Sequence, residues 1–128
     1  MATLQGKKIV VIGGSSGIGY AVAKGALQSL ADHVLIASSS LPKVDTAVQR
    51  LLAEPSLQGQ SNLRNRVGGD ALDLNDGDAI RKFFDKIGEI DHLVITAGNL
   101  SFEEVAFKDT PIDKIRGSSS FIVGAILY

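Results

Sequence analysis

The sequence predicts an α/β fold, a three-layer sandwich in which helices cover a mostly parallel sheet of about four strands. Short apolar runs alternate along the chain with segments whose apolar residues recur at helical spacing. The first run, residues 7–12, is β-branched and does not alternate with polar residues, as expected of a strand buried on both faces. Strands and helices that alternate in this way form a parallel sheet with right-handed crossovers.

The first half of the chain is expected to run strand, helix, strand, helix. Residues 7–12 lead into a helix at residues 17–30, and residues 33–37 form the second strand. Ser40 is expected to cap the helix that follows. The first helix should face the sheet with Ile18, Ala21, Val22, Gly25, Ala26 and Ser29, and the second with Val44, Val48, Leu51 and Leu52.

The second half continues the alternation less regularly. Residues 54–65 contain proline, glycine and several amides without periodicity, which predicts a surface loop. Residues 66–72 are expected to form a short buried strand, although Gly68 and Gly69 disfavour a strand interior. Residues 92–97 should form the fourth strand. The helix between these strands should begin at Asn75 or Asp76 and bury Ala79, Ile80, Phe83, Phe84 and Ile87.

The end of the chain differs from the rest. After Gly98 an irregular stretch leads to a helix start at Thr110 and Pro111, but the glycine and three serines that follow are poor helix formers. The apolar tail, residues 121–128, is compatible with a core helix, an added strand or a self-association surface. We therefore expect one domain over residues 1–128 that is incomplete after about residue 116.

Composition excludes several classes of protein. Hydrophobic residues make up 45% of the chain, too many for disorder, and no apolar run reaches the roughly 18 residues of a membrane-spanning helix. Lys and Arg number 13 against 14 Asp and Glu, which leaves no basic excess for nucleic acid. The sequence has no cysteine for a disulfide framework or a thiolate zinc site, and residues 1–8 lack the apolar core of a signal peptide. A cytoplasmic protein without nucleic-acid or membrane partners is expected.

The segment with the clearest chemistry is residues 12–19, IGGSSGIG, where the first strand turns into the first helix. A pyrophosphate binds backbone amides at a helix N-terminus, and residues without side chains allow its approach. We expect Gly13 to form the tight turn, Gly17 to let the pyrophosphate approach the backbone amides, and Gly19 to let the helix pack closely on the strand. Ser15 and Ser16 are expected to supply hydroxyl donors. Glycine clusters also mark simple turns, but a position between a predicted strand and helix favours a Rossmann-like nucleotide site.

These residues resemble the short-chain dehydrogenase/reductase family. The resemblance covers about residues 9–111, and the glycine spacing is the family's own: Gly13, Gly17, Ile18 and Gly19. Residues 72–76 are similar to the segment with which the family binds adenine. The resemblance implies that Asp73 accepts a hydrogen bond from the adenine amino group and that Leu74 lies against the ring.

A third segment extends the resemblance to the fourth predicted strand. Residues 93–98 are similar to the family's strand that ends in Asn-Asn-Ala-Gly, with Ile95 and Thr96 in place of the asparagines. Ala97 and Gly98 would then line the cofactor ribose. The side-chain amides of the family's two asparagines, and the support that they give to this segment, are absent here.

The end of the second predicted strand favours NADP over NAD. An acid usually binds the free ribose 2′-hydroxyl about 20 residues beyond the glycine loop, and none is present here. Ser38, Ser39 and Ser40 occupy this stretch, and their hydroxyls and amides can donate to a 2′-phosphate, with Lys43 close in sequence. A helix cap and polar turn explain any one of these serines equally well. NADP is the expected cofactor, with NAD less favoured.

The family resemblance also implies a catalytic set that this sequence does not match. The family uses a serine to polarise the carbonyl and a Tyr-x-x-x-Lys pair, because a tyrosine with its free pKa of about 10 gives little phenolate at neutral pH. Tyr20 and Lys24 have this spacing but lie in the helix expected beneath the pyrophosphate, and Tyr128 is the last residue. Ser120 or Phe121 stands where the family has an asparagine. No catalytic residue is assigned.

Two hypotheses follow for function. The first is the NADP(H)-binding half of a short-chain reductase acting on a carbonyl or secondary alcohol, inactive as this chain. The alternative is a non-catalytic module that binds a nucleotide or a protein partner and forms a homo-oligomer through its apolar tail. Neither identifies a substrate, because in this architecture the substrate is bound by segments beyond the fourth strand.

Overall fold

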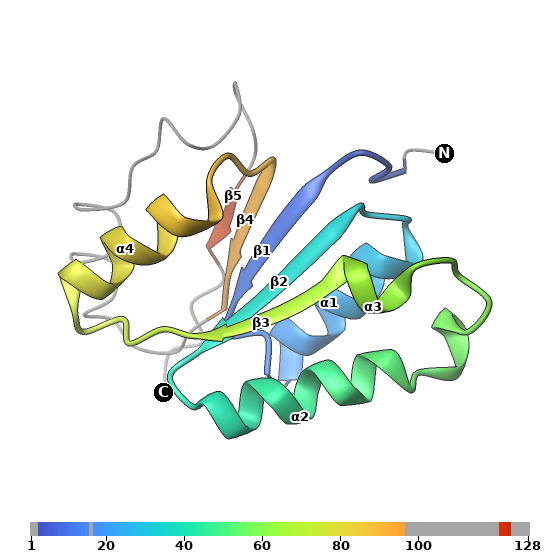
Figure 1. The fold of residues 1–128 in the computed structure, drawn as a ribbon, viewed down its shortest axis with the longest axis horizontal. Coiled ribbons are helices and arrows are strands. Elements are labelled where there is room, and N and C mark those ends of the chain that lie inside the picture. Colours follow the sequence, from blue (N-terminus) through green and yellow to red (C-terminus); the bar gives the residue numbers. More distant parts are fainter. Residues whose placement is uncertain (1–2, 16, 97–120, 124–128) are drawn as a thin grey trace.

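A computed structural model describes residues 3–15, 17–96 and 121–123. Its strands are β1 (Lys8–Ile12), β2 (His33–Ser38), β3 (Val67–Ala71), β4 (His92–Ile95) and β5 (Phe121–Val123). Its helices are α1 (Gly17–Gln28), α2 (Leu41–Leu52), α3 (Leu63–Arg66) and α4 (Gly77–Ile87), with a short 3₁₀ turn η1 (Pro55–Leu57). The sheet is parallel, in the order β3-β2-β1-β4-β5, with α1 and α2 on one face and α4 on the other (Figure 1). The predicted Rossmann-like three-layer fold is confirmed.

The register brings the carboxyl ends of the central strands to one edge of the sheet. Ile12 of β1 lies opposite Ala37 of β2 and Ile95 of β4, and Ser38 lies opposite Ala71 of β3. Since parallel strands end at the same edge, the segments that follow β1, β2, β3 and β4 emerge side by side. This edge is where a site can be assembled from distant parts of the chain.

The core lies on both faces of the sheet, as the continuous apolar run of β1 predicted. Ile9 and Val11 pack into the cluster beneath α1 and α2, while Val10 and Ile12 pack into the cluster beneath α4. All four side chains are at most 2% exposed. Burial on both faces is what distinguishes this strand from an amphipathic one.

The predicted sheet-facing side of α1 is right only in part, since Ala26 is buried and Val22 packs against the core. The buried residues of α1 are Gly19, Tyr20, Ala23, Ala26 and Leu27, so only Ala26 belongs to the expected stripe, and Ile18 is 56% exposed. Apolar and small residues surround this helix, so their spacing alone does not indicate which side faces the sheet. Gly19 packs directly against the carbonyl of Gly13 in the turn after β1, and this contact sets the rotation of α1 about its axis.

The two predicted helix caps have different outcomes. Asp76 is the N-cap of α4, and its side chain accepts a hydrogen bond from the amide of Ala79 at 3.2 Å. Ser40 occupies the N-cap position of α2, but its side chain makes no capping hydrogen bond. The predicted boundaries of both helices therefore hold, whereas the expected role of the Ser40 hydroxyl does not.

The segment expected to be a plain surface loop is more ordered than its composition indicated. It contains η1 and the start of α3, and the side chain of Leu57 is fully buried. The Arg66 guanidinium donates to the carbonyls of Ala31 at 2.9 Å and Leu27 at 3.3 Å, which ties α3 to the C-terminal end of α1. A buried leucine and an arginine clamp give this segment a fixed path that periodicity does not reveal.

Strand β3 contains Gly69 for a packing reason. A Cβ at Gly69 would overlap Val44 Cγ1 of α2 and lie 3.0 Å from Val48 Cγ2. The missing side chain lets α2 lie directly on the strand. The short strand predicted here is confirmed, but it is an edge strand in which only Val67 is buried, so its expected burial was wrong. The glycine that argued against a strand is the residue that allows the helix to approach.

The apolar tail contributes a strand rather than a helix where it is described. Residues Phe121–Val123 pair in parallel with β4, with Leu93 opposite Phe121 and Ile95 opposite Val123. The sheet therefore has a fifth strand beyond the four expected. The helix start predicted at Thr110 and Pro111 and the tail residues 124–128 lie outside the described residues. Among the helices that are described, none is long and apolar enough to cross a membrane.

Candidate cofactor site

The glycine loop begins with a turn that only glycine adopts easily. Gly13 follows β1 with φ of +92°, and its amide donates to the Ala37 carbonyl of β2 at 2.8 Å. Its neighbour Gly14 is needed for a different reason, because a Cβ there would lie 2.7 Å from Ile36 Cγ2. No role was predicted for Gly14, although the adjacent pair of glycines in the sequence was the available signal. The turn is thus packed tightly against β2.

The N-terminus of α1 is open on one side and closed on the other. Gly17, its first residue, has φ of +60°, and a Cβ there would meet nothing within 4 Å. A Cβ at Gly19 would overlap the carbonyl oxygen of Gly13 and lie 2.7 Å from Thr96 Oγ1. Gly19 therefore seats the helix on the turn, and Gly17 leaves its amide end accessible to an anion.

A cavity of about 270 Å³ opens where the loops after β1, β2 and β3 meet. Its lining includes six of the predicted cofactor-binding residues: Gly13, Ser15, Ser38, Ser39, Asp73 and Leu74. The other residues that line the cavity are Ile12, Lys43, Leu72 and Asn75. Three segments that are separated by more than twenty residues in sequence thus share one hollow at the carboxyl edge of the sheet.

Other predicted residues do not line this cavity. Gly17, Ile18 and Gly19 lie in the first turn of α1, and Ser40 is at the start of α2. Ser16, Ala97 and Gly98 lie outside the described residues.

The loop after β2 is a polar turn as well as a cavity wall. Ser38 Oγ accepts a hydrogen bond from the amide of Ser40 at 3.3 Å. Ser39 lies between them and is exposed. The turn interpretation therefore holds for Ser38, while both Ser38 and Ser39 still line the hollow.

The loop after β3 holds the carboxylate of Asp73 in a defined orientation. Asp73 Oδ1 accepts from the amide of Asn75 at 2.9 Å, and the Asp73 carbonyl accepts from the amide of Asp76 at 3.2 Å. This side-chain turn presents the carboxylate at the cavity. Within the lining, Asp73 is the one acid and Lys43, in the first turn of α2, the one cation. No acid stands at the end of β2.

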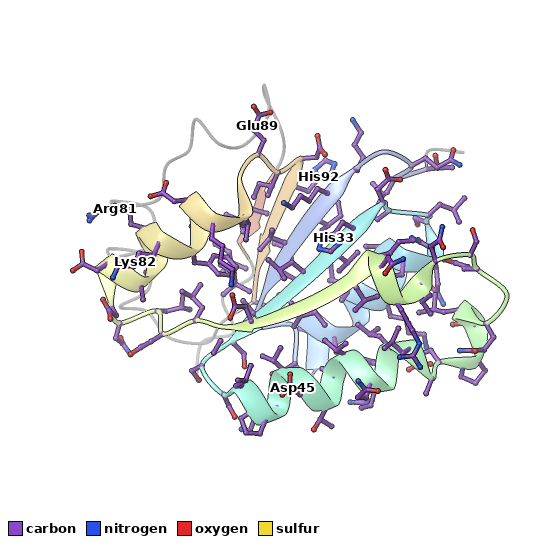
Figure 2. The ribbon with its side chains drawn as sticks, in the orientation of Figure 1. His33, Asp45, Arg81, Lys82, Glu89 and His92 are labelled. Carbon is purple, nitrogen blue, oxygen red and sulfur yellow. The ribbon has the colours of Figure 1, made fainter. Side chains whose placement is uncertain are left out.

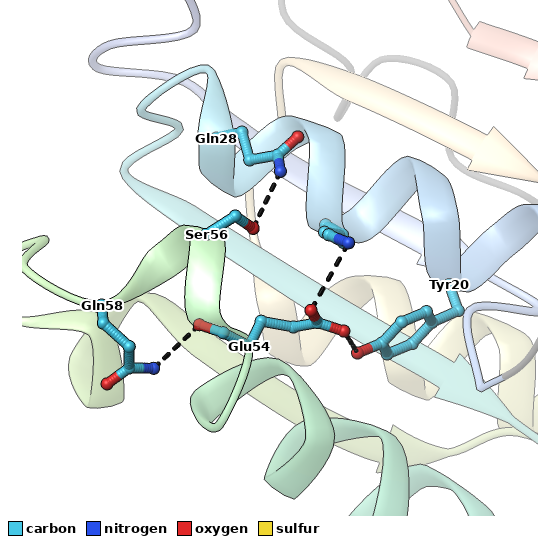
Figure 3. Close-up of polar contacts among 6 residues, drawn as sticks. Tyr20, Gln28, Glu54, Ser56 and Gln58 are labelled. Atoms are coloured by element: carbon cyan, nitrogen blue, oxygen red, sulfur yellow. Dashed lines mark hydrogen bonds and ion pairs between the residues drawn. The ribbon is translucent and has the colours of Figure 1, made fainter.

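Tyr20, the formal match to Tyr-x-x-x-Lys, has a structural environment (Figure 3). It is 7% exposed, and its hydroxyl donates to Glu54 Oε1 at 2.7 Å. Lys24 Nζ lies 3.4 Å from Glu54 Oε2, and the Arg50 guanidinium lies 4.2 Å from the centre of the Tyr20 ring. Burial, followed by the hydrogen bond to Glu54, raises the pKa of Tyr20 to about 12. A general acid and base at neutral pH needs a lowered pKa, so Tyr20 and Lys24 hold the helix in place instead.

A glycine turn at the end of β1, an open helix N-terminus and loops that converge at the carboxyl edge define a dinucleotide-binding α/β domain. The chain belongs to the short-chain dehydrogenase/reductase family. A family model described as an SDR-like Rossmann domain matches residues 2–127.

Two curated relatives match nearly the whole chain. It is 32% identical over 123 residues to the short-chain dehydrogenase/reductase fsr5 of Gibberella fujikuroi, covering 91% of this chain and 44% of that protein. It is 36% identical over 132 residues to the short-chain dehydrogenase/reductase ucsE of an Acremonium species, covering 97% of this chain and 48% of that protein. The chain thus spans less than half the length of these relatives.

Solved structures give the same fold. The RhlG/NADP active-site complex of Pseudomonas aeruginosa superposes with a TM-score of 0.62 at 26% identity, covering 76% of this chain and 35% of that one. The MalC reductase/Diels-Alderase of Malbranchea aurantiaca superposes with a TM-score of 0.63 at 28% identity, covering 76% and 38%. This fold binds a nicotinamide dinucleotide in the family.

Proposed function

We propose that this chain binds NADP(H) and is the cofactor-binding part of a reductase or dehydrogenase that acts on a carbonyl or a secondary alcohol. The observation that carries the proposal is the cavity in which the glycine loop meets Ser38, Ser39 and Lys43 on one side and Asp73 on the other. The dinucleotide, when bound, would supply or accept the hydride. The residues of this chain bind and orient it.

The chemistry of the lining supports a cofactor with a 2′-phosphate. A phosphate needs hydrogen-bond donors and positive charge, and Ser38, Ser39 and Lys43 offer both at the end of β2. A carboxylate at this point would favour the free ribose hydroxyl of NAD and repel the phosphate, and the lining has none there. Asp73 lies at the end of a different strand, where it would accept a hydrogen bond from adenine.

Dissociation constants for NADPH and NADH test the cofactor proposal. We expect the 128-residue chain to bind NADPH more tightly than NADH, and Lys43→Met to reduce this preference by roughly tenfold with little change for NADH. Lys82→Met is the matched control, since Lys82 is an exposed lysine on α4 that does not line the cavity (Figure 2). Equal affinity for both dinucleotides, or an unchanged preference in Lys43→Met, would overturn the NADP assignment.

We further propose that the 128-residue chain binds the cofactor without transferring hydride. Tyr20 and Lys24, the one Tyr-x-x-x-Lys match in the sequence, are held by Glu54, so none of the residues that the structure describes has the properties of the family's proton donor. The measurement is NADPH oxidation in the presence of a panel of aldehydes and ketones. We expect no rate above buffer, and any substrate-dependent oxidation of NADPH by the chain would contradict this part of the proposal.

The second candidate is a non-catalytic module that self-associates through its apolar tail. The unmatched catalytic set favours it. Sedimentation of the chain with and without NADPH separates the two candidates. A dimer that binds neither dinucleotide would support the second candidate, whereas a chain that binds NADPH and remains a monomer supports the first.

A further inference from the structure

Thr96 is the first residue after β4 and reaches across to the turn that opens the glycine loop. Its amide donates to the Ile12 carbonyl at 2.9 Å, which continues the pairing of β4 with β1. Its hydroxyl lies 3.2 Å from the carbonyl oxygen of Gly13 and 3.4 Å from that of Ile12. A hydroxyl has one proton to donate, and the Ile12 carbonyl already accepts from the Thr96 amide. The Gly13 carbonyl is therefore its better acceptor.

The backbone of Gly13 is held on both sides of its Cα, at the amide of the peptide that follows Ile12 and at the carbonyl of the peptide that precedes Gly14. On the β2 side, the Gly13 amide donates to Ala37 at 2.8 Å. On the β4 side, the Thr96 hydroxyl donates to the Gly13 carbonyl. Gly13 has φ of +92°. Because glycine has no side chain, it can adopt several other backbone conformations, so the residue by itself does not fix the direction of its carbonyl. The two hydrogen bonds select one.

The orientation of the Gly13 carbonyl determines where α1 begins. A Cβ at Gly19 would overlap the Gly13 carbonyl oxygen and lie 2.7 Å from Thr96 Oγ1, so the first turn of α1 rests directly on both groups. A rotation of the peptide between Gly13 and Gly14 would push the Gly13 carbonyl oxygen against Gly19 or move it away from Gly19. The amide end of the helix would then move relative to the cavity.

We propose that Thr96 is a positioning residue of the cofactor site, whose hydroxyl fixes the Gly13 carbonyl and through it the N-terminal turn of α1. This inference rests on the proposed cofactor function. Thr96 does not line the cavity, so its effect on binding passes through Gly13 and Gly19. The family that the sequence resembles has an asparagine at this position, and in this chain the hydroxyl of Thr96 stands there and donates to the Gly13 carbonyl.

The test compares variants that remove or keep the hydroxyl. Thr96→Val preserves the shape of the side chain without the O–H, Thr96→Ala removes the hydroxyl and one methyl group, and Thr96→Ser retains the hydroxyl. Two quantities are measured on the 128-residue chain: the dissociation constant for NADPH, and the hydrogen exchange of the amides of residues 14–19 without any cofactor. The amides of β2 report whether the whole fold is affected.

We expect Thr96→Val and Thr96→Ala to bind NADPH roughly fivefold more weakly and to exchange faster at residues 14–19 but not in β2. Thr96→Ser should stay within about twofold of the original chain in both measurements. Equal behaviour of Thr96→Val and the original chain, or faster exchange throughout the fold, would overturn the proposal. If the original chain binds no dinucleotide, the proposed function fails, and the exchange data alone decide the role of Thr96.

Discussion

The hydroxyl of Tyr20 donates a hydrogen bond of 2.7 Å to Glu54 Oε1, and this contact joins the first turns of α1 to the segment that leaves α2. Lys24, one turn further along α1, lies with its Nζ 3.4 Å from Glu54 Oε2. Two residues that have the spacing of a catalytic pair thus share one carboxylate. They fix the helix that carries the glycine loop at its N-terminus.

Removing the hydroxyl of Tyr20 should destabilise the fold without opening a cavity. We expect Tyr20→Phe to lower the free energy of unfolding by about 1 kcal/mol, since the ring remains packed and one largely buried hydrogen bond is lost. Urea denaturation measures the change. Ser56→Ala, which removes the exposed hydrogen bond from Gln28 at 2.9 Å, is the control and should have a much smaller effect. Equal losses in both variants would contradict a structural role for Tyr20.

The raised pKa of Tyr20 predicts a loss of stability in alkaline solution. Tyr20 ionises at about 12 in the folded chain and near 10 when unfolded, so the neutral phenol favours folding. This contribution is fully present below about pH 10 and is lost as pH rises toward 12. Denaturation of Tyr128→Phe and of Tyr20→Phe/Tyr128→Phe between pH 8 and roughly 12 isolates it. The decline should be steeper in the variant that keeps Tyr20, and parallel curves would contradict the assignment.

The lowered pKa of Glu54 predicts a second, acidic dependence. The hydrogen bond from Tyr20, with smaller contributions from Lys24 and Arg50, holds the pKa of Glu54 below its usual value. The stability it contributes is present above the pKa of an unfolded glutamate, about 4.3, and is lost as pH falls through the lower folded value. Glu54→Gln should flatten the stability profile below about pH 5. An unchanged acid profile in this variant would show that other carboxylates cause the decline.

A side chain at Gly17 should interfere with cofactor binding. Gly17 has φ of +60° and faces open space at the helix end where the pyrophosphate would bind, so Gly17→Val introduces both strain and obstruction. We expect NADPH affinity to fall roughly tenfold or more, as measured by titration. Gly25→Ala, on the same helix where a Cβ also meets nothing, should leave affinity unchanged. An unaltered dissociation constant for Gly17→Val would exclude this helix end as the pyrophosphate site.

The two glycines of β3 should respond differently to alanine. Gly69→Ala would drive a methyl group into Val44 and Val48, and we expect a loss of about 1 to 3 kcal/mol in unfolding free energy as α2 shifts away from the strand. Gly68→Ala is the matched neighbour on the other face, where the nearest atom is the flexible end of Leu35 at 3.3 Å. It should be tolerated. Similar losses at both positions would mean that strand propensity, not helix contact, sets the cost.

The class of fold, the order of the first four strands with α1, α2 and α4 between them, and the position of the glycine loop could be predicted from the sequence. These features are local: β1 is a continuous apolar run, α4 has one apolar stripe behind its Asp76 cap, and Gly13 and Gly17 stand between a strand and a helix. Each follows from residues that are neighbours along the chain, so periodicity and spacing are sufficient to predict them.

The tertiary structure alone decided which side of α1 is buried, why β3 tolerates Gly69 and how Leu57 and Arg66 order the segment after α2. It also decided that Lys43 joins Ser38 and Asp73 in one cavity and that Thr96 meets Gly13. Each of these facts depends on contact between segments far apart in sequence. Such contacts depend on strand order, register and the distance between helix and sheet. None of these produces a periodic pattern of residues in the sequence, so they cannot be predicted from periodicity.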